Sequence, residues 1–397
     1  MANLSSERES PTGERRGGEG RRVRVLIVDD SALMRRLLSD LLSSAAEIEV
    51  VGFARDGREA IAEAARLRPD VVTLDVEMPE VSGLEALPTL LAVHEVPVLM
   101  VSSLTQEGAE VTLQALELGA VDYLPKPQKN PLGEMRAARD VLIARVLAAA
   151  QSRVRRPGRG RGARARPVDA GALAAPPASS IAASPDRPRR GPAAPAPEVT
   201  PIGVVVIGIS TGGPQALSQV LPMLAAPIPP VLIVQHMLAE FTGVFAQRLD
   251  RYTDSSIRVK QAEEGDAIIA DRILIAPGGR HLAITGKSPR ARVTISDEPE
   301  VSGHRPSIDV LFRSAAAAYG SAVAAILMTG MGRDGVDGCK AVRQAGGLTL
   351  GQDEATSVVY GMNKAALIEG TLVAQFALDG LPSILQDLAA YRARLGS

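Results

Sequence analysis

The sequence predicts an α/β protein with two doubly wound parallel-sheet domains joined by a disordered linker. In both halves of the chain, apolar runs of β-forming residues alternate with amphipathic helical stretches, and between residues 146 and 200 this alternation stops. The length of 397 residues also exceeds what one hydrophobic core usually serves. We expect a disordered leader at 1–21, a first domain at 22–145, the linker at 146–200 and a second domain at 201–397.

Strands of the first domain are expected at four apolar runs: Val23–Val28, Val71–Leu74, Pro97–Val101 and Ala120–Leu124. Helical stretches separate them, with one apolar stripe running from Leu33 to Leu42 and another from Ala60 to Ala65. Repeated βα units place crossover helices on both faces of a parallel sheet.

The linker is defined by its composition. Residues 153–200 hold ten Arg, nine Pro and three acidic residues. Such a segment cannot bury enough apolar area to order itself. An Arg-rich stretch can contact nucleic acid or acidic lipid, but a solvated linker is the simpler interpretation.

The second domain repeats the alternation. Strands are expected at Val204–Ile207, Val231–Val234, Ile273–Ile275, Ala322–Met328 and Leu348–Leu350, and a β-ribbon at His281–Thr285 and Arg292–Ile295. Helices are expected at 214–224, 240–251, 307–319 and 335–345.

The composition restricts the class of protein. A net charge of -1 gives no global reason to expect a nucleic-acid partner. The single cysteine, Cys339, excludes an internal disulfide framework and fits a reducing compartment. The first 22 residues contain no apolar signal region, and no stretch approaches the roughly 20 apolar residues that span a bilayer. We expect a soluble cytoplasmic protein without membrane insertion.

Acidic side chains follow two strands of the first domain. Asp29 and Asp30 come directly after the first strand, and Asp75 follows Val71–Leu74. Because the carboxyl ends of neighbouring parallel strands meet at one edge of the sheet, we expect the three carboxylates to converge. Like charges this close require a hard cation, and Mg²⁺ held by carboxylates and waters is the natural solution.

Two more polar residues follow later strands of the first domain, Ser102 and Lys126. A hydroxyl and a cation beside a metal-bound carboxylate suit phosphoryl transfer to Asp75. Each residue alone has a simpler interpretation, since a strand-end aspartate often caps the next helix and a lysine before proline often lies in a solvated turn. Five such residues at successive strand ends favour the phosphoryl-transfer site.

Four segments of the first domain resemble the response-regulator receiver family: Val25-Leu-Ile-Val-Asp-Asp-Ser, Leu74-Asp-Val-Glu-Met-Pro, Val101-Ser-Ser and Lys126-Pro127. The resemblance covers about residues 22–140 and implies a flavodoxin-like fold. It implies these roles: Asp75 as phospho-acceptor, Asp29, Asp30 and Asp75 around Mg²⁺, Ser102 as switch hydroxyl, Lys126 as the family's lysine, and Tyr123 as its aromatic switch residue. The chain departs from the family at Val81-Ser82-Gly83, where receivers commonly carry Met-Asp-Gly, in a loop outside the chemistry.

The second domain carries a serine at a predicted strand-to-helix turn. Gly208-Ile-Ser-Thr-Gly-Gly follows a strand and precedes a helix, so Ser210 lies at the carboxyl edge of the sheet. The glycines allow close backbone approach, and free N–H groups at the helix start suit a developing oxyanion. Ser210 is therefore the candidate nucleophile, with backbone N–H groups near Thr211 and Met331 as candidate oxyanion donors.

A serine nucleophile needs a base, and three histidines lie in the second domain. His236 directly follows a strand and shares an edge with Ser210, so it is the preferred base. His281 opens the ribbon, where we expect a surface position, and His304 precedes a helix as a capping or supporting residue.

The orienting acid is sought in the Gly-rich loop after the strand Ala322–Met328. Asp334 lies in this loop, although it could instead cap the helix that follows. Asp309 and Asp266 are weaker candidates because each lies away from a convincing strand end. In the resulting Ser-His-Asp triad the serine attacks a carbonyl, the histidine transfers the proton and Asp334 orients the imidazole.

Four segments of this domain resemble the chemotaxis receptor methylesterase family: Gly208-Ile-Ser-Thr-Gly-Gly-Pro, Val234-Gln-His-Met, His304-Arg-Pro-Ser-Ile-Asp-Val-Leu-Phe and Leu327-Met-Thr-Gly-Met-Gly-Arg-Asp-Gly. The resemblance covers about residues 202–390 and implies a Rossmann-like hydrolase domain without a cofactor. It implies Ser210, His236 and Asp334 as the triad that hydrolyses γ-glutamyl methyl esters, and deamidates glutamines, on methyl-accepting chemotaxis receptors. A chemotaxis histidine kinase would be the phosphodonor.

Guided by this family, we expect the unphosphorylated first domain to cover the Ser210 site and phosphorylation of Asp75 to loosen the contact. Two other functions compete. A transcriptional regulator requires a helix-turn-helix with a basic face in the second half, and this half reads as α/β. A dinucleotide-dependent oxidoreductase requires a glycine where Ser210 stands and a ribose-binding acid about 20 residues further on.

Overall fold

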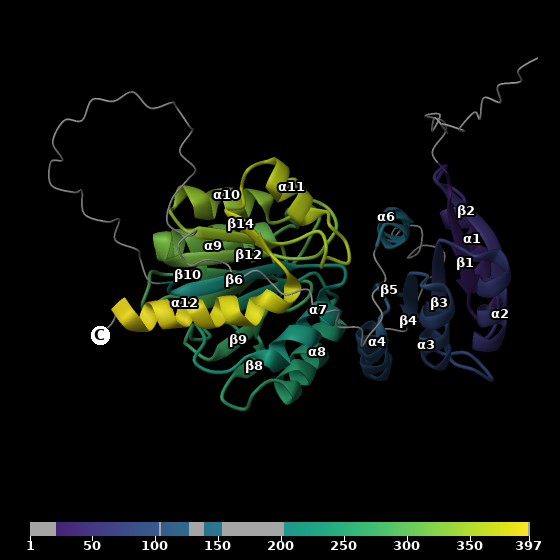
Figure 1. The fold of residues 1–397 in the computed structure, drawn as a ribbon, viewed down its shortest axis with the longest axis horizontal. Helices are drawn as coiled ribbons and strands as arrows, with labels where there is room; N and C mark the ends of the chain where they lie inside the picture. Colours follow the sequence, from purple (N-terminus) through teal and green to yellow (C-terminus); the bar gives the residue numbers. More distant parts are fainter. Residues whose placement is uncertain (1–20, 103–104, 127–138, 153–201, 396–397) are drawn as a thin grey trace, which may run out of the picture.

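The computed structural model describes residues 21–102, 105–126, 139–152 and 202–395, and within them the chain forms two α/β domains that pack side by side (Figure 1). Residues 1–20 of the expected leader and 153–200 of the expected linker lie outside the described residues. The predicted fold class, two doubly wound parallel-sheet domains, is confirmed.

The first domain is built on a five-stranded parallel sheet in the order β2-β1-β3-β4-β5. Its strands are β1 (Val23–Val28), β2 (Ile48–Ala54), β3 (Val71–Asp75), β4 (Val98–Ser102) and β5 (Asp122–Pro125). Its helices are α1 (Ala32–Leu42), α2 (Gly57–Leu67), α3 (Gly83–His94), α4 (Gln106–Leu118) and α6 (Arg139–Ala150). The strand order reverses between β1 and β3, and this places the residues after these two strands at the switch point.

Two apolar layers sandwich this sheet because its side chains alternate between the two faces. Val25 and Ile27 pack with α1 and α6, whereas Leu26 and Val28 belong to the cluster that holds α2, α3 and α4. Helix α6 continues through Ala150, so residues 146–150, which the sequence analysis places in the linker, are helical. Strand β2 is not predicted from the sequence, because it is an edge strand whose mixed burial breaks up the apolar run.

Side-chain caps determine where several helices of the first domain begin. Ser31 accepts a hydrogen bond from the Met34 backbone N–H and so begins α1 directly after Asp29 and Asp30. Ser82 and Glu85 form a reciprocal capping box at the start of α3. These caps fix the loops at the carboxyl edge of the sheet, where the acidic residues lie.

The second domain is built on a seven-stranded parallel sheet in the order β14-β13-β12-β6-β7-β9-β8. The strands are β6 (Val204–Ile209), β7 (Val231–Gln235), β8 (Arg258–Gln261), β9 (Arg272–Ile275), β12 (Val323–Leu327), β13 (Leu348–Gln352) and β14 (Ala374–Phe376), with the antiparallel ribbon β10 (His281–Thr285) and β11 (Arg292–Ser296) beside them. Strand β6 is central and lies between β12 and β7. The residues that follow these three strands therefore meet at one edge.

Helices cover both faces of the second sheet. They are α7 (Gly213–Val220), α8 (Ala239–Tyr252), α9 (Ile308–Tyr319), α10 (Val336–Gln344), α11 (Met362–Ile368) and α12 (Leu381–Leu395), with short 3-10 turns at Leu221–Met223, Gly320–Ala322 and Leu378–Gly380. The helix predicted at 214–224 ends at Val220 and tightens into a 3-10 turn that contains Pro222. Four elements of this domain are not predicted from the sequence: β8, β14, α11 and α12.

The two domains share a buried apolar contact. Helix α4 of the first domain packs against α7 and α8 of the second. One continuous cluster joins Leu113 and Leu116 of α4 to Leu217 and Val220 of α7. Figure 1 shows α7 and α8 on the side of the second domain that faces α4. The domain interface is therefore a packed surface of the kind found inside a domain.

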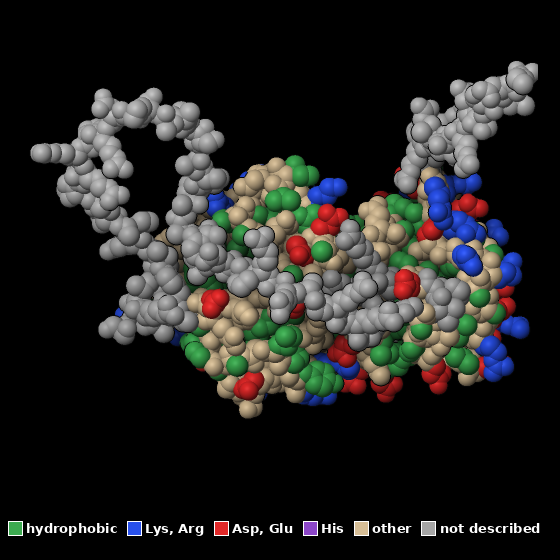
Figure 2. Space-filling view, in the orientation of Figure 1, with side chains coloured by type: hydrophobic (Ala, Val, Ile, Leu, Met, Phe, Trp, Pro, Cys, Tyr) green, Lys and Arg blue, Asp and Glu red, His purple; other side chains and the backbone are tan. Residues whose placement is uncertain are grey.

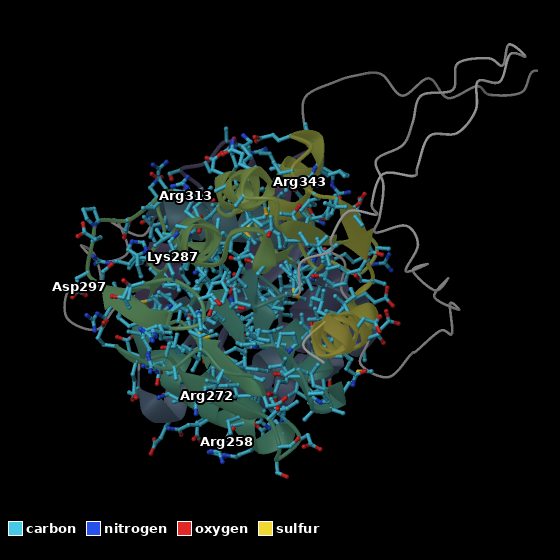
Figure 3. The ribbon with its side chains drawn as sticks, turned by 90° about the vertical axis from the view of Figure 1, so that its left-hand side faces the viewer. Arg258, Arg272, Lys287, Asp297, Arg313 and Arg343 are labelled. Atoms are coloured by element: carbon cyan, nitrogen blue, oxygen red, sulfur yellow. The ribbon has the colours of Figure 1, made fainter. Side chains whose placement is uncertain are left out.

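Charged side chains lie on the outer surfaces. In Figure 2, Lys and Arg side chains gather at the end of the molecule formed by the first domain. Four of its exposed arginines each pair with an acidic residue: Arg21 with Asp70, Arg36 with Asp40, Arg55 with Glu59 and Arg66 with Glu63. The opposite end of the molecule carries the outward-pointing residues labelled in Figure 3: Arg258, Arg272, Lys287, Asp297, Arg313 and Arg343. Among the described residues, no helix combines the length and the apolarity needed to cross a bilayer.

Candidate active site

The Ser210 turn directly follows β6 and leads into α7. The Ser210 backbone N–H donates to the Thr329 carbonyl at 2.9 Å, and the Gly213 N–H donates to the Ser210 carbonyl at 2.8 Å. Gly212 adopts a φ of 78°, which glycine reaches without steric cost. A side chain at Gly330 would collide with the Ser210 side chain, so the two loops can approach only with glycine at this position.

His236 and Asp334 lie within hydrogen-bond reach of this turn. His236 Nδ1 is 3.2 Å from Ser210 Oγ, and His236 Nε2 is 2.9 Å from Asp334 Oδ2. The register explains the first distance, because Ile209 of β6 pairs with Gln235 of β7 and the next residues leave the sheet together. The structure thus brings together the three residues that the sequence analysis selected as nucleophile, base and acid.

Asp334 is 1% exposed and is held by four donors. Besides His236 it accepts bonds from Ser307 Oγ at 2.8 Å, the Ile308 N–H at 2.7 Å and the Asp309 N–H at 3.1 Å. Burial raises the pKa of Asp334, but the bond to His236 and the backbone donors outweigh it and keep the pKa below its usual value. The carboxylate therefore remains ionised and fixes the proton of the imidazole on Nε2, which leaves the Nδ1 lone pair facing Ser210.

Gln235 is a supporting residue that the sequence analysis did not single out. Its side-chain amide is 2% exposed and donates to the carbonyls of Ser210, at 3.0 Å, and of His236, at 3.1 Å. It thereby connects the nucleophile turn to the base turn. The sequence holds no signal for this role beyond the position of Gln235 directly before His236.

The two other histidines of this domain lie close to the site. The His304 ring stacks on the His236 ring, with centroids 3.9 Å apart and planes at 11°. Burial and the neighbouring His236 lower the pKa of His304 to about 4, so this ring is neutral at pH 7. The expected surface position of His281 is wrong, because His281 is 1% exposed. Its Nε2 bonds to the Pro299 carbonyl at 3.0 Å, and its Nδ1 accepts from the Ser307 N–H at 3.2 Å.

The two weaker acid candidates have other partners. Asp309 accepts from the backbone N–H groups of Gly335 at 3.0 Å and Gly338 at 2.6 Å, and so holds the start of α10. Asp266 pairs with Lys260 at 3.1 Å. Asp309 is a neighbour of Asp334 through its backbone N–H, and burial raises the pKa of its carboxyl.

The predicted oxyanion donors lie on the loops that flank Ser210. Thr211 directly follows it, and the Thr211 hydroxyl donates to Asp122 Oδ2 of the first domain at 2.8 Å. Met331 lies in the loop after β12 and lines a cavity between this loop and α6. Their role as N–H donors to an oxyanion stays a prediction.

The acidic residues of the first domain converge as predicted. One oxygen from each of Asp29, Asp30 and Asp75 lies within 4.8 Å of the others, and Lys126 Nζ bonds to Asp75 and lies 3.4 Å from Asp29 Oδ2. Burial raises the pKa of Asp75 to about 6 and raises that of Asp29. One lysine does not balance three carboxylates, so a small divalent cation fits this oxygen cluster.

Ser102 ends β4, and Tyr123 is the second residue of the neighbouring strand β5. Ser102 is buried at the end of β4, and its hydroxyl donates to the Gly108 carbonyl at 3.3 Å. Tyr123 is 2% exposed and reaches into the second domain, where its hydroxyl accepts from the Leu238 N–H at 3.1 Å and its ring lies 4.4 Å from Phe241. Its position couples the end of the first sheet to α8.

Comparison with known proteins identifies the family of each domain. The family model described as CheB methylesterase matches residues 205–385, and the one described as response regulator receiver domain matches residues 25–136. A protein-glutamate methylesterase/protein-glutamine glutaminase of Koribacter versatilis is 43% identical over 93% of this chain and 96% of its own length. Relatives of the same name from Pyrococcus abyssi and Caulobacter vibrioides are 40% and 42% identical over 91% and 94% of this chain, and over 92% and 99% of their own lengths.

The chain belongs to this methylesterase/glutaminase family. The family and the enzyme class predicted from the motifs are confirmed, and the second half is a methylesterase domain instead of a DNA-binding or dinucleotide-binding unit. Among solved structures, the Thermotoga maritima CheB methylesterase catalytic domain is 34% identical and covers 48% of this chain and 100% of that chain, with a TM-score of 0.45. The response regulator domain of Thermotoga maritima CheB is 45% identical and covers 33% and 98%, with a TM-score of 0.31.

Proposed function

We propose that this protein is a phosphorylation-activated serine hydrolase that demethylates glutamyl methyl esters, and deamidates glutamines, on chemotaxis receptors. The observation that carries the proposal is the hydrogen-bonded series Ser210 Oγ, His236 Nδ1, His236 Nε2 and Asp334 Oδ2. Family membership supplies the substrate class, because the relatives are named for both reactions.

The geometry supports a distinct proposed role for each residue of the triad. Ser210 Oγ attacks the side-chain carbonyl of the receptor residue while its proton moves to His236 Nδ1. The same proton then goes to the leaving methoxide or amide group, which departs as methanol or ammonia. Water attacks the acyl-enzyme, gives a proton to Nδ1, and the glutamate is released as Ser210 recovers its hydrogen. Asp334 stabilises the imidazolium formed in both halves of the cycle.

Backbone N–H groups of the flanking loops would stabilise the oxyanion. The proposed donors are Thr211, which directly follows Ser210, and Met331, in the loop after β12. In serine hydrolases the loss of one such donor costs about 3 kcal/mol of transition-state stabilisation.

The first domain would act as a phosphoryl acceptor. Asp75 is the proposed nucleophile toward a chemotaxis histidine kinase, and Asp29, Asp30 and Asp75 would hold Mg²⁺, which neutralises the charge of the transferred phosphoryl group. The Lys126 ammonium already bonds to Asp75 and would pair with the phosphoryl oxygens. Ser102, at the end of β4, and Tyr123, within β5, are the proposed switch residues.

Phosphorylation would act on the hydrolase through the domain interface. The first domain contacts residues immediately beside the triad, since Asp122 bonds to Thr211 and Tyr123 bonds to the residue two positions after His236. Phosphorylation replaces the single charge of the Asp75 carboxylate with up to about two negative charges on the phosphoryl group and can repack the strand that carries Asp122 and Tyr123. We infer that the unphosphorylated domain restricts access to Ser210 and that phosphorylation loosens this contact. The expected partners are chemoreceptors and their kinase in the cytoplasm.

Methanol release from methylated receptor tests the hydrolase assignment. Wild-type protein should release methanol faster with acetyl phosphate and Mg²⁺ than without, whereas Ser210→Ala should reduce release by a factor of at least about 10³ in both conditions. Asp75→Ala should keep the basal rate and lose the response to acetyl phosphate. A Ser210→Ala variant that retains wild-type release would overturn the triad, and an Asp75→Ala variant that still responds would overturn the gate.

A further inference from the structure

His304 lies at the corner of a tight turn beside the triad. The backbone groups of Val301 and His304 bond to each other in both directions, at 3.1 and 3.0 Å. The two residues between them, Ser302 and Gly303, adopt φ values of 56° and 74°. A two-residue turn with positive φ at both positions is a rigid hairpin connection, so the direction of the His304 side chain is well defined.

The loop that contains this turn is tied down at its base by His281. Its imidazole bonds to the Pro299 carbonyl on one side and to the Ser307 N–H on the other, and so joins the two ends of the loop to β10. Ser307 in turn donates its hydroxyl to Asp334. The same short segment therefore holds the acid of the triad and presents His304.

The His304 ring covers one face of His236. Its plane lies at 11° to that of His236, and the centroids are 3.9 Å apart. The two hydrogen bonds of His236, to Ser210 and to Asp334, lie at opposite edges of its ring. A tilt of the ring about an in-plane axis that crosses the line between Ser210 and Asp334 would carry both partners out of the ring plane and weaken both bonds, because a bond to a ring nitrogen is strongest in the ring plane. A parallel ring packed on the face blocks that tilt.

We propose that His304 is a positioning residue that holds the His236 imidazole flat between Ser210 and Asp334. The reaction that His304 supports is the one given by the proposed function, whereas the stacking of His304 on His236 is independent of that proposal. Burial, and after it the neighbouring His236 and Arg145 of α6, lower the pKa of His304 against the opposing effect of Asp334, so the ring is held in its neutral form. A neutral ring supports His236 without opposing the charge that His236 acquires when it takes the serine proton.

Three substitutions at His304 distinguish the effect of a stacked ring from the effect of side-chain volume. His304→Phe retains a planar ring, His304→Leu fills a similar volume without one, and His304→Lys adds a charge. In the full-length protein we expect His304→Phe to keep kcat within about threefold of wild type. His304→Leu should lower kcat about tenfold with KM within twofold, because substrate contacts are unchanged and the orientation of the base is lost. His304→Lys should shift the acid limb of the pH profile of kcat/KM downward by about one pH unit, because a like charge disfavours protonated His236.

A second measurement makes the test independent of catalysis. The ¹⁵N resonances of the His236 ring report its protonation and tautomer in the full-length protein. We expect the Nε2–H form to persist in the Phe variant, to become mixed in the Leu variant and to titrate at lower pH in the Lys variant. Equal kcat values for Phe and Leu with unchanged ¹⁵N shifts in both would overturn the proposal. If Ser210→Ala retained methanol release, the assigned reaction would fail, while the ¹⁵N shifts would still decide the role of His304.

Discussion

At the scale of single residues, the bond between His236 and Asp334 determines what the imidazole can do. Asp334 bonds to Nε2, so the free lone pair is on Nδ1 and faces Ser210. The buried carboxylate keeps this arrangement because two backbone N–H groups and the Ser307 hydroxyl hold it in place. In the proposed mechanism, Asp334 therefore fixes the tautomer of the base that activates Ser210.

Asp334→Asn tests this assignment. The new amide would accept from the Ser307 hydroxyl and the Asp309 N–H through its oxygen and present its NH₂ group to Nε2 and to the Ile308 N–H, which loses its acceptor. The ring proton of His236 would then move to Nδ1, opposite Ser210. We expect kcat to fall by a factor on the order of 10⁴ with little change in KM, measured as methanol release. Ser307→Ala, which removes one bond to the same carboxylate, is the matched control and should lose far less. A loss in Asp334→Asn no greater than that of the control would contradict the tautomer assignment.

His304 also predicts a pH dependence of stability. Its pKa is about 4 in the folded protein and about 6.5 in the unfolded chain, so the unfolded state binds more protons between these values. The free energy of unfolding should therefore fall as the pH is lowered through this window, by at most about 1.4 kcal/mol per pH unit. Asp75, whose pKa is raised to about 6, acts in the opposite direction, because its folded form binds the proton first.

Comparison of wild type with His304→Phe isolates the histidine from Asp75. Urea unfolding between pH 7 and pH 4.5 should show that the variant loses less stability on acidification than the wild type. Parallel curves for the two proteins would show that His304 titrates normally in the folded state.

At the scale of elements, β6, α7 and β7 form one unit around Gln235. The Gln235 side chain lies against the first residue of α7, Gly213, and bonds to the carbonyls of Ser210 and His236. A Cβ atom on Gly213 would overlap Gln235 Oε1. Glycine is therefore required at the start of α7, because the side chain of any other residue there would displace the amide that joins the two turns.

Gly213→Ala should accordingly impair both folding and catalysis. Gln235 must move, and loss of its two hydrogen bonds in a buried site costs about 1–3 kcal/mol of stability. We expect a lower midpoint in urea unfolding and a fall in kcat of at least tenfold. Gly243→Ala is the control, because Gly243 lies within α8 with only an ordinary contact to Gln261 and alanine favours a helix. A Gly213→Ala protein as active and as stable as Gly243→Ala would show that the space is not needed.

At the scale of the whole molecule, the two domains are joined by an apolar contact with a polar rim. Glu117 of α4 accepts from Arg248 Nε of α8 at 2.6 Å in a bidentate ion pair, and it also accepts from Ser218 Oγ at 3.3 Å. Both charged side chains are about three-quarters buried, at 24% and 21% exposure. A partly desolvated bidentate pair contributes more than an exposed one and favours the closed arrangement of the domains.

Weakening this pair should release part of the inhibition without phosphorylation. For Arg248→Gln we expect the basal rate of methanol release to rise about fivefold, equivalent to about 1 kcal/mol, while the rate with acetyl phosphate stays near wild type. The control is Arg66→Gln, which removes an exposed ion pair with Glu63 on α2. An unchanged basal rate in Arg248→Gln would show that this contact does not restrict the site.

How well a strand can be predicted from the sequence depends on how fully its side chains are buried. Strands that are buried on both faces, such as β3 and β7, form unbroken apolar runs in the sequence. Their predicted ends agree with the structure to within one residue. The edge strands β2, β8 and β14 carry exposed or half-exposed side chains, so their runs are interrupted and no strand was predicted there. The predicted surface position of His281 is wrong for a related reason, because the burial of His281 depends on the loop that folds over β10.

The amino-acid sequence by itself determined the two parallel-sheet domains and the edge at which Ser210, His236 and Asp334 meet. It could do so because alternation of strand and helix is a local pattern, and parallel strands deliver the residues that follow them to one edge. Only the tertiary structure decided which nitrogen of His236 faces Ser210, that His304 stacks on it, that Gln235 joins the two turns and that Asp122 and Tyr123 contact the second domain. These contacts join residues far apart in the chain, and their geometry is set by packing, which no local pattern encodes.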